Sequence, residues 1–228
     1  MVVGPLNQDT GHQASRGMNA PSPRPQVRHM RRACVVAFVG LVLTAGAARG
    51  DDRIDVGLLL GSTRATDEGA ALQFGRALTY QATFAWRVWR NDRAAVSFEV
   101  PFLASPAFDV ETAVGSLPKE YASLYLTPGV RVAVPVRRPI SAFAAVGAGY
   151  ARYSESRLRR DGGPNPSQQD TNTAALGFGG GIDVKAWPWL GFRGEIRDVY
   201  TGARRFSIPT PSPSVHNVVV SGGLVLWF

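Results

Sequence analysis

The residues that could carry acid–base or nucleophilic chemistry are few in this chain of 228 residues. It contains three histidines and one cysteine, and His12, His29 and Cys34 lie within the first fifty residues. Only His216 remains farther along, with several serines close to it in sequence. Nucleophilic catalysis needs a base that is itself held in place by a third group, and no such spacing is visible. The sequence shows no metal-ligand cluster, phosphate-binding loop or cofactor motif, so we expect no cofactor.

Charged residues at regular spacing are a second set of candidates. Each lies in a segment where polar and apolar residues alternate, on the face away from the apolar residues. If those apolar faces point the same way, the acids and bases gather together on the other side. Charges removed from water are tolerated only when they are paired and hydrogen-bonded. We therefore expect a mixed, internally paired polar network, formed by Glu99, Arg131, Asp183, Lys185, Arg193, Glu195 and Arg197.

Strict alternation predicts the strands that would position these charges. From Leu78 to Val88 every even-numbered residue is apolar, and a period of two is the signature of a strand with one apolar face. Residues 140–153 are rich in alanine and glycine, so their facing stays open. Segments of about 9–11 tilted residues cross a bilayer. The predicted strands are 53–61, 77–88, 95–102, 123–134, 140–153, 174–186, 190–200 and 215–228.

Links between these strands alternate between short turns and long loops, as in bacterial outer-membrane barrels. The aromatic residues separate in the same way: all five tryptophans fall at the short-turn end. This predicts two aromatic girdles at the membrane interfaces. The short turns are near 90–92, 135–139 and 187–189, the long loops are 62–75, 104–120, 154–173 and 201–214, and the tyrosines at the long-loop end are Tyr121, Tyr150, Tyr153 and Tyr200.

The direction of the two faces follows from the cost of exposing charge to lipid, which is about 2–4 kcal/mol for a midplane Arg or Lys. A soluble barrel would instead expose large aliphatic rows to water. We predict an all-β protein, an eight-stranded antiparallel up-and-down transmembrane β-barrel with a lumen filled by side chains. The turn at 187–189 sets Asp183 across from Arg193, and glycines 181 and 179 across from Glu195 and Arg197, where they would leave room. Asp198 falls on the lipid-facing parity, so either a bulge shifts it or it lies beyond the bilayer.

The N-terminal region has the composition of a targeting segment. Residues 30–50 combine Arg31 and Arg32 with an apolar run over 33–47, which predicts a secretory signal peptide; an N-terminal anchor helix is the alternative. We expect residues 1–29 to be a non-structural extension and 51–228 to be the barrel. The leader's six arginines and one aspartate account for +5 of the net charge of +8. A net charge of +8 would suggest a nucleic-acid partner, but residues 51–228 carry only +3, which does not support one.

Three stretches resemble the small eight-stranded outer-membrane barrels, the OmpA/OmpX-like group of Gram-negative bacteria. They are the glycine-rich strand 142–150, the stretch 177–184 and the C-terminal segment 222–228, and the resemblance covers 52–228. It implies a monomer in the outer membrane, with long loops outside, short turns in the periplasm, and contact with membrane lipid and lipopolysaccharide. It also implies that Phe228 is the signal read by the outer-membrane assembly machinery.

The function expected from these features is structural or surface-interacting, with the lumen plugged by the charged network. Basic residues outside a membrane suit phosphate-bearing lipopolysaccharide. A narrow channel for ions or small solutes is the alternative, and a lipid A-modifying barrel enzyme is a more distant one; we do not expect an enzyme. The candidate anion contacts in the long loops are Arg157, Arg159, Arg160, Arg204 and Arg205.

Overall fold

A computed structural model describes residues 53–66, 73–74, 76–111, 119–159, 161–166, 170–202 and 214–228. The chain divides into two units, Met1–Ala47 and Ala48–Phe228, and only the second contains described residues. The expected extension and signal peptide therefore lie outside them, and both remain predictions. Among the described residues no helix has the length and apolar character needed to cross a membrane.

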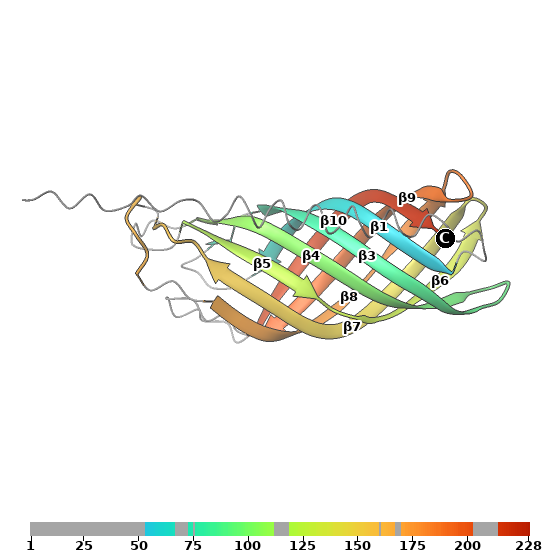
Figure 1. The fold of residues 1–228 in the computed structure, drawn as a ribbon, viewed down its shortest axis with the longest axis horizontal. Helices are drawn as coiled ribbons and strands as arrows, with labels where there is room; N and C mark the ends of the chain where they lie inside the picture. Colours follow the sequence, from blue (N-terminus) through green and yellow to red (C-terminus); the bar gives the residue numbers. More distant parts are fainter. Residues whose placement is uncertain are drawn as a thin grey trace, which may run out of the picture. The chain divides into compact units, whose positions relative to one another are not determined.

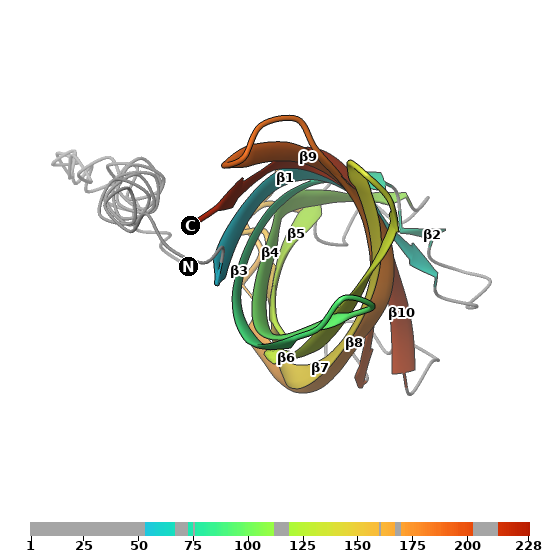
Figure 2. The same ribbon diagram turned by 90° about the vertical axis from the view of Figure 1, so that its right-hand side faces the viewer.

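The strands form a closed antiparallel barrel (Figure 1). Closure occurs where the first long strand pairs with the last, in a register that joins Asp55 to Trp227. Viewed from the short-turn end, the strands close into a ring (Figure 2). The strands are β1 (Ile54–Thr66), β2 (Gln73–Phe74), β3 (Arg76–Arg90), β4 (Ala95–Glu111), β5 (Glu120–Leu126), β6 (Gly129–Arg137), β7 (Ile140–Glu155), β8 (Asp170–Lys185), β9 (Leu190–Gly202) and β10 (Ser214–Trp227).

These ten strands make an eight-stranded barrel, which confirms the predicted fold class. β2 pairs only with the far end of β4. β5 and β6 are two halves of one strand, because β4 pairs with Leu126 and Gly129 in one unbroken register. The break falls at Thr127 and Pro128, and proline has no N–H to give to the ladder.

The outer surface is made by even-numbered residues on the long strands, up to the register shift in β4 between Ser105 and Phe108. Apart from three tryptophans in or beside turns, the exposed large apolar residues are all even-numbered. The facing of residues 140–153, open in the sequence, is resolved by Phe143 and Ala145, which are buried inside the barrel. Since no charge interrupts the outward row of β3 between Leu78 and Val88, the outer wall carries an apolar band of bilayer-spanning length.

Strands continue farther toward the long loops than alternation predicted. β7 runs to Glu155 and β8 begins at Asp170, although the loop was expected to cover 154–173. Hydropathy marks only the part of a strand whose outward row is apolar. Beyond the apolar band the ladder persists while outward residues become polar, as at Arg64 and Arg152.

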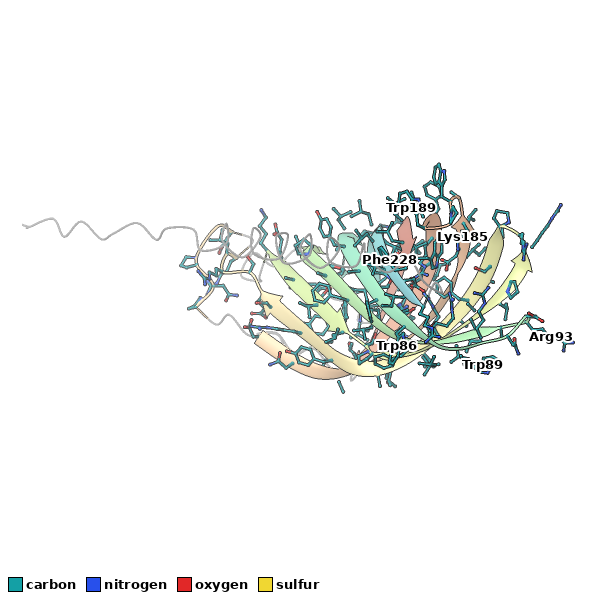
Figure 3. The ribbon with its side chains drawn as sticks, turned by 45° about the vertical axis from the view of Figure 1, so that its right-hand side comes forward. Trp86, Trp89, Arg93, Lys185, Trp189 and Phe228 are labelled. Carbon is teal, nitrogen blue, oxygen red and sulfur yellow. The ribbon has the colours of Figure 1, made fainter. Side chains whose placement is uncertain are left out.

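Four of the five tryptophans are exposed at the short-turn end as predicted, whereas Trp227 has the inward parity of β10 and part of the tyrosine girdle is wrong. Trp86, Trp89 and Trp189 lie at the short-turn end (Figure 3) and are at least half exposed. At the opposite end Tyr121 and Tyr153 are buried inside the barrel instead of facing lipid. Both have odd numbers, and the parity of their strands directs them inward.

Candidate functional site

The interior nearest the short turns is filled by ion pairs around Arg193. Its guanidinium donates to Asp183 through Nε at 2.7 Å and Nη2 at 2.9 Å, and Nη1 donates to Thr83 at 3.2 Å. The ring of Phe143 lies under the guanidinium at 4.8 Å. Asp183 and Arg193 are directly paired across β8 and β9, as the turn position predicted. In this planar, bidentate arrangement, each of the three nitrogens of the buried guanidinium donates a hydrogen bond.

A second arginine, Arg197, bridges two carboxylates. It donates from Nη2 to Glu99 at 2.5 Å and from Nε to Glu195 at 2.6 Å. Glu195 also accepts from the amide of Gln81 at 3.0 Å, and Ser221 donates to the Gln81 oxygen at 2.8 Å. The pairs therefore extend across the lumen from β9 to β3, β4 and β10.

The third arginine links these two groups. Arg131 of β6 donates to Asp55 and lies 3.5 Å from Glu99, between Nη1 and Oε2. Asp55 in turn lies 3.6 Å from Arg193. We call the resulting set the charged layer: Asp55, Glu99, Arg131, Asp183, Arg193, Glu195 and Arg197.

Six of the seven predicted residues are thus brought together, and one lies apart. Lys185 is near the barrel mouth, with Nζ 5.2 Å from the centre of the Trp227 ring. Asp55 replaces it in the layer, and sequence reasoning missed it. The signal was available, because Asp55 has the inward parity of β1.

The glycines opposite the charges have different roles. A Cβ on Gly179 would lie 2.9 Å from the Cα of Arg197, so this glycine does allow close approach there. A Cβ on Gly181 would instead lie 2.7 Å from Cζ of Phe143. The expectation that Gly181 makes room for Glu195 is wrong, because an aromatic ring occupies that space.

The interior nearest the long loops is filled by aromatic rings. Phe108 and Tyr121 stack at 4.7 Å with an interplanar angle of 4°, and Tyr125 meets Tyr153 edge-on at 5.9 Å. Tyr121 also contacts Tyr153, at 6.3 Å. We call these four residues the aromatic layer. The expected plug of charged and polar side chains is therefore only part of the filling, since these aromatic rings also occupy the lumen.

A bulge in β4 explains one of these rings. The register with β5 shifts between Ser105 and Phe108, so the inward parity changes from odd to even and Phe108 enters the lumen. The Tyr153 ring carries its own hydrogen-bond partners: its hydroxyl lies 2.9 Å from Thr201 Oγ1 and accepts from Asn217 at 3.3 Å.

The outer surface at the long-loop end has its own polar pair. Asp198 Oδ2 lies 2.7 Å from His216 Nδ1, and the Tyr200 ring lies 4.9 Å from the imidazole. β9 keeps a continuous register with both neighbours, which excludes a bulge at Asp198. His216 is therefore a histidine with an acidic partner at the edge of the apolar band.

Arginines line the same end, above the apolar band. Arg64 and Arg76 face outward directly opposite each other on β1 and β3, and both are exposed. Arg157 is also exposed and Arg159 is half-buried, whereas Arg160, Arg204 and Arg205 lie outside the described residues. Arg152 donates to Asp170 at 2.8 Å. Hydrogen bonds from Ser154 and Arg152 lower the pKa of the Asp170 carboxyl, which lies beyond the band.

The last residue closes the barrel wall. The Phe228 backbone N–H donates to Ile54 at 2.8 Å, and Ile54 donates back at 3.1 Å. Its role in assembly stays a prediction. Within the part of the chain that the structure describes, no three His, Cys, Asp or Glu residues are grouped as metal ligands.

Comparisons with known proteins identify the fold. Neisserial surface protein A shares 14% identity with a TM-score of 0.55, covering 77% of this chain and 97% of its own. Ail, the attachment invasion locus protein of Yersinia pestis, shares 12% identity with a TM-score of 0.46, covering 76% and 99%. No family model and no curated protein matches the sequence. The resemblance to the small eight-stranded outer-membrane barrels is confirmed at the level of the fold.

Proposed function

We propose that this chain is an integral outer-membrane β-barrel with a structural or surface-interaction role and a plugged lumen. One observation carries the proposal: the closed barrel is apolar outside and ion-paired inside. Lipid stabilises such a wall, whereas water would leave the aliphatic rows exposed. The proposed orientation places the short turns, with their tryptophans and Phe228, in the periplasm, where the assembly machinery acts. The long loops then lie on the outside of the cell.

The membrane assignment is tested by the gel mobility of protein extracted from membranes. A folded barrel resists SDS until it is heated, so heated and unheated samples are expected to migrate at different positions. Identical migration of the two samples, with the protein in the soluble fraction of lysed cells, would contradict the proposal.

Two layers in series support a plug over a channel. Arg193 and Arg197 are at most 2% exposed, and Phe108 and Tyr125 are fully buried. An ion crossing the lumen would have to displace paired charges and then stacked rings. We expect no sustained openings from the refolded barrel in planar bilayers. Steady conductance from the intact chain would favour the narrow-channel alternative.

The arginines above the apolar band support a phosphate-bearing partner in the outer leaflet. Arg64 and Arg76 would repel each other if nothing lay between them, and a lipopolysaccharide phosphate could bridge both guanidinium groups. Native mass spectrometry of the purified barrel is expected to show bound lipopolysaccharide. Loss of the adduct in R64Q/R76Q is the expected result, and its retention would contradict this assignment.

A lipid-modifying enzyme is the more distant candidate, and the hydrogen bond between Asp198 and His216 is the observation that favours it. Carboxylate and imidazole are two parts of an acid–base triad, and Ser214 precedes His216 by two residues on the same strand. We nevertheless expect lipid A from expressing cells to have an unchanged mass. A new lipid A species that disappears in His216→Ala would replace the non-enzymatic proposal.

A further inference from the structure

Two neighbouring short turns carry four exposed arginines. Arg90 and Arg93 belong to the hairpin between β3 and β4, and Arg137 and Arg138 to the hairpin between β6 and β7. β4 and β6 are paired, with Ala95 opposite Ala133, so the two turns lie side by side. Asp92 is the one acidic residue in these two turns. We call the four residues the arginine sector.

The third short turn has a different composition. Residues 186–189 read Ala-Trp-Pro-Trp and carry no charge. Trp187 and Trp189 are both more than half exposed, at 55% and 57%. Figure 3 shows Arg93 and Trp189 on different turns at the same end of the barrel. The arginine sector and this tryptophan turn are therefore two different parts of the short-turn end, which also carries the exposed Arg53 before β1 and the half-buried Lys185 before the tryptophan turn.

The position of Trp89 indicates how deep in the bilayer the arginine sector lies. A bulge between Arg87 and Trp89 pairs Trp89 with the outward residue Val96, and its ring is 50% exposed on the outer wall. The hairpin tip lies about two residues beyond it, or roughly 7 Å along the strand. The headgroup layer on each side of a bilayer is about 5–8 Å thick. Arginines at this depth face lipid phosphates, because the turn is too short to extend beyond them.

We propose that the arginine sector binds the phosphates of anionic phospholipids in the leaflet that the short turns face. The inference rests on the proposed membrane function. A guanidinium donates two parallel hydrogen bonds to phosphate, and four of them around two adjacent turns outnumber the single carboxylate of Asp92. The uncharged tryptophan turn has no such preference, so the lipid shell around the barrel is asymmetric.

The experiment compares two tryptophan reporters in bilayers. One variant keeps only Trp89 and another keeps only Trp189, with the other tryptophans changed to phenylalanine. Each is placed in phosphatidylcholine bilayers that contain equal amounts of either brominated phosphatidylglycerol or brominated phosphatidylcholine. Trp89 is expected to show a relative affinity for the anionic lipid of about fivefold, whereas Trp189 is quenched equally by both.

Substitutions separate charge from fold. R90Q/R93Q/R137Q/R138Q in the Trp89 variant is expected to remove the preference, and the matched lysine replacement of the same four residues is expected to keep most of it. R157Q/R159Q at the opposite end is the control and should change nothing. Equal quenching of Trp89 by the two lipids, or a preference that survives the four glutamines, would overturn the inference alone. Absence of quenching by either lipid would overturn the proposed membrane function as well.

Discussion

The charged layer and the aromatic layer fill one lumen by opposite means. In the charged layer, Arg131, Arg193 and Arg197 each contact two carboxylates. In the aromatic layer the rings are held by stacking and edge contacts, with hydroxyls bonded at their margin. The wall around both layers has the same closed strand geometry, so the filling does not follow from the barrel itself.

The difference teaches where specificity comes from in such a barrel. A buried charge that loses its partner keeps its desolvation cost, so the charged layer tolerates little change. Apolar packing tolerates substitutions that conserve volume. We therefore expect the short-turn half of the lumen to be sensitive to single substitutions and the long-loop half to be permissive.

The largest effect is expected from Arg193→Met. The substitution leaves Asp183 buried without its bidentate partner and removes the ion pair between Arg193 and Asp55. The free energy of unfolding should therefore fall by about 3–5 kcal/mol. Urea unfolding of the refolded barrel, followed by tryptophan fluorescence, measures the loss. Lys185→Met is the matched control, because Lys185 lies outside the layer, and it should cost well under 1 kcal/mol. A loss for Arg193→Met as small as that of the control would remove the contrast between the layers.

The pair variant D183L/R193M should recover part of this loss. With both partners apolar, no charge is stranded at that register position, so the double variant is expected to be at least about 1 kcal/mol more stable than Arg193→Met alone. The same unfolding measurement applies to both variants. A double variant less stable than the single one would mean that Arg193 acts mainly through Asp55 and Phe143.

Phe108→Leu tests the aromatic layer. The side chain stays apolar and close in volume, but the parallel stacking on Tyr121 is lost, so a cost of about 1 kcal/mol is expected. Far-ultraviolet circular dichroism should be unchanged. A cost near that of Arg193→Met would show that this layer is as intolerant as the charged one.

Tyr153→Phe tests the hydroxyl contacts of the aromatic layer. It removes one hydroxyl that lies within hydrogen-bond distance of Thr201 and accepts from Asn217, and a neutral bond of this kind contributes about 1 kcal/mol or less. The expected loss is therefore at or below that of Phe108→Leu, measured in the same urea series. A larger loss would place the hydroxyl bonds above ring packing in this half of the lumen.

Sequence alone predicts much of the charged layer, because charge is conspicuous on an alternating strand. The pairings of Asp183 with Arg193 and of glycine with Glu195 and Arg197 follow from one short turn and match the register. Asp55 lies among aliphatic and glycine residues, where one inward carboxylate is easily passed over. Its odd-numbered position in β1 was nevertheless a sufficient signal for the lumen.

The aromatic layer is harder to predict for two physical reasons. Rings are compatible with lipid, interface and core alike, so their position along a strand does not decide their facing. Tyr125 and Tyr153 could have been placed inside by parity, but Phe108 could not, because the β4 bulge that turns it inward has no signal in the alternation. Phe143 was hidden among alanines and glycines, which carry little facing information.

The smallest effect concerns charge outside the lumen. Arg64 and Arg76 are directly opposite on the outer wall, and like charges in that position destabilise a sheet by a few tenths of a kcal/mol. Arg76→Glu should therefore stabilise the barrel slightly in zwitterionic detergent, by about 0.5 kcal/mol, as measured by urea unfolding at low salt. The sign should reverse in bilayers that contain lipopolysaccharide, because the substitution also removes one phosphate contact. Stabilisation in both media would mean that charge on the outer wall is governed by the neighbouring strand alone, whereas a reversal would show that lipid is the partner outside, as carboxylates are inside.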